Sequence, residues 1–230
     1  MSGLYLYALA AAGSAEPLGE GFAGETLRRV EEGPVAAVVG DTEAPPVTPE
    51  TLAAHDAVVR RLAERLPALL PARFGQTVPD ERTLTSWLAG RQRDLVEALA
   101  LVEGCVQMTL RVFAGPDVVE PEIAELSVPD SDLGPGARYL AERRQAVERA
   151  RALPEIAPLR EALRPLLKSE RVERPAAPGR LRATAYDLIP RSEADAYTRT
   201  VAETAPRLSG WKVTASGPWP PYAFVPGLLA

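Results

Sequence analysis

The sequence contains only one cysteine and one histidine in 230 residues. Cys105 alone cannot form an internal disulfide, and one cysteine with one histidine cannot make a His/Cys zinc site. No stretch approaches the roughly 18 to 20 consecutive apolar residues of a membrane-spanning helix, and the N-terminal M-S-G-L-Y-L-Y lacks the basic flank of a secretory signal. Because 46% of the residues are hydrophobic, the chain can still bury a substantial core. We therefore expect a globular cytoplasmic protein with no cofactor, no metal and no membrane span.

The usual signatures of catalytic sites are also missing. No G-x-S-x-G elbow, G-x-x-x-x-G-K-[ST] loop or G-x-G-x-x-G fingerprint occurs. His55 shares the apolar face of a predicted helix with Leu52 and Val59, so a packing role is favoured over acid/base chemistry. Cys105 begins a predicted strand without a basic cluster to activate its thiol. We expect no catalytic residues and a protein that is not an enzyme, although a carboxylate-only metal site stays open.

The charges are unevenly distributed along the chain. The formal net charge is −5, with an excess of acidic side chains in residues 1–136 and an excess of basic ones in residues 137–230. Such asymmetry can steer a partner or help two domains dock. The basic residues are interleaved with acidic ones instead of forming a continuous phosphate-binding stripe, so we expect no nucleic-acid binding.

The first half of the chain predicts two strands followed by two helices. Residues 4–9 and 34–40 are aliphatic, aromatic or β-branched runs typical of strands, and the small polar residues between them indicate a loop. Thr48 is a typical N-cap for a helix with Pro49 at its first position. This predicted helix has an apolar stripe and ends at Pro71. The stripe contains Leu52, Val59, Leu62, Leu66 and Leu69.

A second helix is predicted from Asp80, its N-cap, to Gly104. The segment L-P-A-R-F-G-Q-T-V, residues 70–78, separates the two helices. It is expected to contain a short strand at residues 72–74 and a turn at Gly75. Phe74 is expected to pack inward, and Arg73 is the best single contact candidate in this half. We interpret the segment as a structural connection in preference to a catalytic loop.

The second half predicts the order β-α-α-β-α-β. Residues 106–112 alternate between apolar and polar side chains, as in a half-buried strand. Helices are expected at about 136–153 and 155–170, a strand at 181–189, a helix capped by Ser192 and a strand at 211–215. We predict an α+β fold with two small α+β domains, residues 1–104 and 105–230. The second is expected to have a ferredoxin-like antiparallel sheet with extra helices.

The C-terminal segment G-P-W-P-P-Y-A-F-V combines three prolines with three aromatic residues. Proline favours a stiff, extended backbone without a regular hydrogen-bond ladder. Trp219, Tyr222 and Phe224 are expected either to dock on the protein's own sheet or to contact a partner. Docking on the chain itself is favoured, because a wholly exposed aromatic tail promotes aggregation.

The sequence resembles the GvpL/GvpF family of gas vesicle proteins over nearly its whole length. The resemblance rests on L-Y-L-Y-A near the N-terminus, Ala54-His55, L-P-A-R-F-G, E-G-C-V-Q-M-T-L-R-V, G-A-R-Y-L from Gly136, and G-P-W-P-P-Y-A-F. The last segment is the most specific. Gln107 departs from the pattern, because the resemblance leads us to expect an acid there.

The resemblance implies a non-enzymatic accessory protein for assembling gas vesicles, the gas-filled protein shells of buoyant prokaryotes. It implies a location in the cytoplasm, at the gas vesicle surface or its assembly site. The implied partners are the small hydrophobic shell protein and other accessory proteins, during nucleation or growth of the shell. The candidate partner contacts are Arg73, Phe74, Trp219, Tyr222 and Phe224, joined by a sheet edge of the second domain that is open to strand addition.

Two other interpretations stay open at this point. A small-molecule-binding regulatory protein would use the ferredoxin-like domain as a sensing module, and a Gly-rich ligand loop would favour it. An enzyme with carboxylate chemistry would be favoured by a carboxylate pair at the end of a well-formed strand. Neither feature is evident in the sequence.

Overall fold

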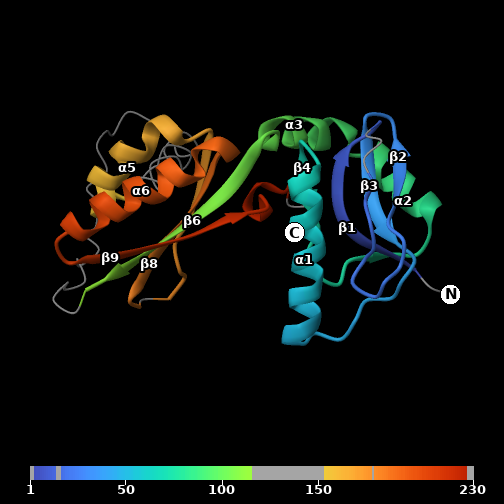
Figure 1. Ribbon diagram of the computed structural model, residues 1–230, viewed down its shortest axis with the longest axis horizontal. Coiled ribbons are helices and arrows are strands. Elements are labelled where there is room, and N and C mark those ends of the chain that lie inside the picture. The colour runs from blue at the N-terminus through green and yellow to red at the C-terminus, as the bar shows by residue number, and fades with distance from the viewer. Residues whose placement is uncertain (1–2, 14–16, 116–152, 178, 227–230) are drawn as a thin grey trace, which may run out of the picture. The chain divides into compact units, whose positions relative to one another are not determined.

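The computed structural model describes residues 3–13, 17–115, 153–177 and 179–226, and its contacts divide the chain into two compact units (Figure 1). Unit 1 contains the chain up to Gln107 together with the C-terminal segment from Pro218, and unit 2 is Met108–Gly217. Each unit combines helices with an antiparallel sheet, so the α+β class is confirmed. The C-terminal segment was expected in the second domain. It belongs to unit 1 because its side chains pack there, as described below.

The sheet of unit 1 has the order β2-β3-β1-β4, and β5 also pairs with β1. All pairs are antiparallel. The strands are β1 (Leu4–Ala11), β2 (Arg28–Glu32), β3 (Val35–Gly40), β4 (Leu69–Pro71) and β5 (Thr77–Val78). The two strands predicted in this region are confirmed as β1 and β3, whereas β2 was missed. Only Val30 of β2 is fully buried and its neighbours are charged, so it lacks the apolar pattern of a strand.

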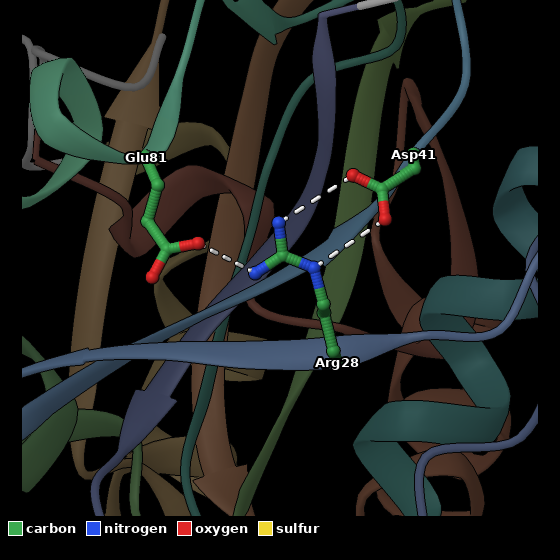
Figure 2. Close-up of polar contacts among 3 residues, drawn as sticks. All are labelled: Arg28, Asp41 and Glu81. Carbon is green, nitrogen blue, oxygen red and sulfur yellow. Dashed lines mark hydrogen bonds and ion pairs between the residues drawn. The ribbon is translucent and has the colours of Figure 1, made fainter.

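Charged side chains fix the edge strand β2 to its surroundings. Figure 2 shows Arg28 of β2 between Asp41, which follows β3, and Glu81 at the start of helix α2 (Glu81–Ala89). The guanidinium lies 3.4 Å from Asp41 Oδ1 and 2.9 Å from Glu81 Oε2. All three side chains are more than one third exposed, so each pair contributes at most about 1 kcal/mol. Charged groups on an outer strand also discourage pairing with another chain.

Helices cover both faces of this sheet. They are α1 (Pro49–Arg65), α2 (Glu81–Ala89) and α3 (Gln92–Val102). Tyr5 and Tyr7 of β1 pack in one cluster with Val59 of α1, whereas Leu6 lines a cavity with Leu84 of α2. Because neighbouring strand residues point to opposite faces, α1 and α2 lie on different sides of the sheet, as Figure 1 also shows.

The helix boundaries partly follow the predictions. Thr48 caps α1 in a capping box with Thr51, and Asp80 caps α2 through the Thr83 N–H, as expected from their residue types. The first helix is shorter than predicted, because Leu69 lies in β4, and Leu52 is 42% exposed. The single second helix is in fact two, interrupted at Gly90, a poor helix former. No helix among the described residues is both long and apolar enough to cross a membrane.

The sheet of unit 2 has the order β7-β8-β6-β9, which is the strand order of a ferredoxin-like fold. Its strands are β6 (Cys105–Ala114), β7 (Ser169–Glu173), β8 (Leu181–Pro190) and β9 (Trp211–Trp219). Those at β6, β8 and β9 were predicted. Strand β7 was missed because its sequence S-E-R-V-E is mostly charged, and it occupies the end of an expected helix. Strand β6 is buried on both faces up to Leu110 and is therefore not half-buried as expected.

The described helices of unit 2 are α5 (Ala157–Leu163) and α6 (Ala194–Thr204). The helix expected at 155–170 is reduced to α5 with 3-10 turns at Pro154–Ile156 and Arg164–Leu166. A proline lies at the first or second position of each of these three segments, and proline interrupts a continuous helix. Ser192 does not cap α6, because a 3-10 turn at Arg191–Glu193 precedes that helix. The helix expected at 136–153 lies almost entirely outside the described residues.

Candidate partner-binding site

The Arg73–Gly75 loop joins β4 to β5 and is fixed to β1 at both ends. The Ala72 N–H donates to the Tyr7 carbonyl oxygen at 2.9 Å, and the Gly75 N–H donates to the Tyr5 hydroxyl at 3.0 Å. Gly75 has a φ of +85°, which a residue with a side chain adopts only under strain. The segment is thus built as a structural connection.

One detail of the predicted connection is corrected by the structure. The strand expected at residues 72–74 is replaced by β4 and β5, which flank the loop, because the glycine turn interrupts pairing with β1. Phe74 is half-buried, consistent with the expected inward packing, and Arg73 is exposed. Within the part of the chain that the structure describes, no carboxylate forms an ion pair with Arg73.

Behind the loop, His55 of α1 lies inside an aromatic cluster. Its Nδ1 is 2.9 Å from the Tyr5 hydroxyl, and its ring stacks on Tyr7 with centroids 5.7 Å apart. Phe74 meets the imidazole edge-on at 5.6 Å. His55 is only 3% exposed, and burial lowers its pKa, opposed by the Ala72 backbone and Asp56. The predicted packing role of this histidine is confirmed.

A loop before β2 closes the same cluster. The Tyr7 hydroxyl donates to Glu25 Oε1 at 2.5 Å and accepts from the Phe22 N–H at 3.0 Å. The Phe22 ring then packs edge-on against Tyr5 with centroids 5.0 Å apart. A Cβ on Gly21 would lie 1.9 Å from Glu25 Oε1, so only glycine leaves room for this carboxylate. The cluster is therefore held by specific hydrogen bonds as well as by apolar contact.

The burial of His55 predicts a loss of unit 1 stability in acid. The unfolded histidine has a pKa of 6.5, and the folded pKa is lower, so below pH 6.5 the unfolded chain binds a proton that the folded unit resists. We expect the free energy of unfolding to fall as pH drops from 6.5 towards the folded pKa. Urea unfolding in a Trp211→Phe background measures this, because Trp87 and Trp219 both belong to unit 1. The His55→Phe variant is expected to lose most of this pH dependence, and an unchanged dependence would contradict the assignment.

The C-terminal segment docks on unit 1 through its prolines and aromatic side chains. Pro220, Pro221 and Val225 are buried, and Tyr222 packs against the core cluster that includes Tyr5 and Val59. Burial raises the pKa of the Tyr222 hydroxyl, and the nearby Asp56 carboxylate adds to this effect. The 3-10 turn η5 (Tyr222–Phe224) also contacts β4. The predicted docking of this segment on the protein's own sheet is confirmed.

Three side chains outside the segment hold it in place. The Ala223 N–H donates to Gln107 Oε1 at 2.8 Å, so this buried glutamine accepts where the resemblance suggested an acid. The Arg60 guanidinium lies 4.3 Å from the centre of the Trp219 ring, an attractive cation–π geometry. Asp56, one helical turn earlier, accepts from Arg60 Nε at 2.6 Å and orients it.

The structure thus brings the five candidate contacts onto one unit. Arg73 and Phe74 follow β4, and the turn that carries Tyr222 and Phe224 contacts the same strand. Trp219, Tyr222 and Phe224 are half-buried, so part of each side chain stays accessible, and Arg73 is exposed. We call these five residues the aromatic docking surface. Sequence reasoning missed Arg60 and Gln107, although the Asp56/Arg60 spacing is a helical ion-pair signal.

Other kinds of site find little support in the described part of the chain. There, no group of three or more His, Cys, Asp or Glu side chains is placed to hold a metal ion. Cys105 is buried, and its thiol donates to the Glu103 carbonyl oxygen at 3.3 Å. A largely apolar cavity of about 310 Å³ lies between β5 and α2, with Trp87 in its wall. It belongs to unit 1, whereas the regulatory interpretation placed a ligand site in the second half.

Comparison with known proteins agrees with the fold. The family model of gas vesicle synthesis protein GvpL/GvpF matches residues 3–226. Gas vesicle protein F1 of Halobacterium salinarum is 26% identical over 228 residues, covering 96% of this chain and 92% of that protein. The crystal structure of GvpF from Anabaena sp. PCC7120 superposes with a TM-score of 0.71 at 18% identity, covering 98% of this chain and 97% of that one. GvpF from Microcystis aeruginosa gives 0.72 at 17% identity, covering 98% and 100%. The chain therefore belongs to the GvpL/GvpF family of gas vesicle synthesis proteins.

Proposed function

We propose that this protein is a non-enzymatic accessory protein of gas vesicle assembly, and that it binds the small hydrophobic shell protein through the aromatic docking surface. It would act in the cytoplasm, at the gas vesicle surface or its assembly site, during nucleation or growth of the shell. The observation that carries the proposal is the C-terminal segment, which presents three half-buried aromatic side chains from a fixed position on unit 1.

The properties of a gas-filled shell explain why its subunits would need a binding surface of this kind. A shell subunit that keeps water from the gas phase is apolar and strand-forming, and before polymerisation it exposes edges that pair wrongly. Aromatic side chains held in place lose little conformational entropy when they contact such a partner, which is why they dominate many interfaces. Arg73 would add a polar contact at the rim of the surface.

Strand β9 offers a second element for the same partner. It is an outer strand in the described sheet of unit 2, and it leads directly into the docked segment. An outer strand exposes backbone N–H and C=O groups that an extended segment of a partner can pair with. We propose that β9 also pairs with an extended segment of the shell protein by strand addition.

Replacing Trp219 with alanine is the direct test. Truncation removes a half-exposed ring and its contact with Arg60, so we expect capture of the purified shell protein to weaken about tenfold, as for an interface residue of intermediate importance. Co-purification at low and high ionic strength measures the loss. Trp87→Ala is the matched control, because Trp87 is also a half-buried tryptophan beside an arginine, Arg91, but lies on α2 and outside the aromatic docking surface.

The possible outcomes test the binding site and the identity of the partner separately. Equal capture by a folded Trp219→Ala variant and by wild type would contradict the site. Equal loss of capture in both tryptophan variants would show that the loss is not specific to the aromatic docking surface, and would also contradict the site. If wild type captures no shell protein at either ionic strength but captures another accessory protein, the partner assignment is wrong while the assembly role is retained.

A further inference from the structure

The cavity between β5 and α2 has an apolar floor, an aromatic wall and an opening to solvent. Leu6 and Leu84 line it and are 3% and 1% exposed, so they form its floor. Trp87 is half-buried and lies in the wall, and Thr77 is exposed at the rim. The Arg91 guanidinium lies 4.9 Å from the centre of the Trp87 ring, a cation–π contact that helps to fix this ring. The cavity therefore has the anatomy of a small-molecule site.

The volume of the cavity limits the size of the molecule that fits. An apolar cavity of about 150 Å³ in a protein core binds benzene, which has a single ring. The volume here is about 310 Å³, so there is room for about two fused rings. Among the described residues that line the cavity, none has a charged side chain. A neutral molecule is therefore favoured, because an ion buried without a partner is costly.

The backbone of β5 adds a hydrogen-bond donor and an acceptor at the rim. Thr77 pairs with Tyr5 of β1 in the sheet register, and the Leu6 N–H donates to the Gln76 carbonyl oxygen at 2.9 Å. Hydrogen-bonded and non-hydrogen-bonded pairs alternate along antiparallel strands, so the N–H and C=O of Thr77 point away from β1. In the described sheet, β5 pairs with β1 and with no further strand. A ligand with an acceptor beside a donor can therefore pair with both groups of Thr77.

We propose that this cavity binds a neutral heteroaromatic molecule of about two fused rings with a donor and an acceptor on neighbouring ring atoms. The rings would lie between Leu6, Leu84 and Trp87, and the polar edge would pair with the Thr77 backbone. Contact with the Trp87 ring favours a flat aromatic molecule over an aliphatic one of equal volume. The five residues of the aromatic docking surface are not among those that line the cavity, so the proposal does not depend on shell-protein binding.

The first test compares two probes on the full-length wild-type protein by isothermal titration calorimetry. Indazole has two fused rings and an N–H next to a ring nitrogen that accepts. Indole is the matched control, because it keeps the rings and the N–H but has a C–H in place of the acceptor. We expect indazole to bind about fivefold to tenfold more tightly, since indole leaves the Thr77 N–H without a partner. Equal affinity of the two probes would contradict the role of the Thr77 backbone.

The second test fills the cavity. Val78 of β5 lines it and is half-buried, so Val78→Phe is expected to weaken indazole binding at least tenfold by occupying the space of one ring. Val47→Phe is the matched control, because Val47 is 77% exposed and is not among the residues that line the cavity. A folded Val78→Phe variant that binds indazole as tightly as Val47→Phe would overturn the proposal.

A third probe tests the class of the occupant. The tripeptide Gly-Trp-Gly with blocked ends offers an aromatic side chain together with backbone donors and acceptors. We expect it to bind more weakly than indazole, because β5 contains only two residues and offers little strand to pair with. Tighter binding of the tripeptide, lost in Val78→Phe, would assign the cavity to a segment of a partner protein and would overturn the small-molecule assignment.

Discussion

Unit 2 is expected to unfold more easily as the pH rises from about 4 to about 7, because of one buried carboxyl group. Asp187 is 1% exposed, and its Oδ2 accepts from the Tyr197 hydroxyl at 2.5 Å. Its Oδ1 has no hydrogen-bond partner among the described residues. Burial raises the pKa of Asp187 from 3.8 to about 7; Tyr197 lowers it, Glu170 raises it and Arg160 lowers it. The folded unit therefore keeps a proton that the unfolded chain has already released.

The sign and size of this effect follow from proton linkage. Between pH 4 and 7 the folded state binds more protons than the unfolded state, so stability is greatest below the unfolded pKa and falls as pH rises through the folded pKa. The total change is on the order of 4 kcal/mol, since each pKa unit corresponds to about 1.4 kcal/mol. Above pH 7 the contribution is expected to be flat.

Hydrogen exchange of the β8 and α6 amides, corrected for intrinsic rates, measures the stability of unit 2 across this range. Asp187→Asn is expected to abolish most of the pH dependence, because the amide keeps the acceptor for Tyr197 without a titrating group. Asp195→Asn is the control, since Asp195 is exposed on α6. If wild type and Asp187→Asn show the same slope between pH 4 and 7, Asp187 does not carry the effect.

Truncating Tyr222 to alanine is expected to release the C-terminal segment and destabilise unit 1. The ring packs against the core cluster with Tyr5 and Val59, and it is the aromatic side chain of the turn that lies deepest in those contacts. Truncating a fully buried aromatic ring to alanine lowers the free energy of unfolding by about 3 to 5 kcal/mol. For this half-buried side chain we expect a loss of roughly 2 kcal/mol. The segment should then become sensitive to limited proteolysis. The Tyr222 ring no longer packs beside the hydrogen bond from the Ala223 N–H to Gln107 Oε1, so this bond is expected to break more often.

Tyr222→Phe separates packing from the polar group. The hydroxyl forms no hydrogen bond with the described residues, so phenylalanine should keep nearly all of the stability. Urea unfolding in the Trp211→Phe background gives the free energies of unit 1 for the two variants. If Tyr222→Ala unfolds at the wild-type free energy, the segment contributes no stability to unit 1. If Tyr222→Phe is destabilised as strongly as alanine, the hydroxyl and not the ring carries the contribution.

The opposite pH responses of the two units have a common cause. Both His55 and Asp187 are buried beside a tyrosine hydroxyl, and burial favours the neutral form of each. The neutral form is deprotonated for a histidine and protonated for a carboxylic acid. Acidification below pH 6.5 is therefore expected to weaken unit 1, while unit 2 gains stability over the overlapping range.

Much of the fold could be predicted where local pattern and burial agree. Several features depend only on contacts within an element or next to it, and these were predicted. They are the apolar runs at β1 and β3, the alternation in β6, and the caps Thr48 and Asp80. The missed strands β2 and β7 lie at the outer positions of their sheets and consist mainly of charged residues. Their pairing partners, and not their own side chains, make them strands.

The candidate partner-binding site could also be predicted only where a local sequence pattern indicated it. Proline and aromatic content identified the C-terminal segment, and the residue types at Arg73 and Phe74 identified the loop. No local pattern indicated that α1 would supply Arg60 to Trp219, or that Gln107 would accept from Ala223 over more than a hundred residues of sequence. Those partners meet only in the folded chain.

The sequence by itself determined the α+β class, the central strands, the helix caps Thr48 and Asp80, and the resemblance to the GvpL/GvpF family. These features depend on composition, on periodicity and on short segments that can be read in place. Tertiary structure alone decided that the C-terminal segment packs on unit 1, that two charged segments become outer strands, and that Tyr197 donates to the buried Asp187. Such outcomes depend on contacts between residues far apart in the chain, whose energies no single segment contains.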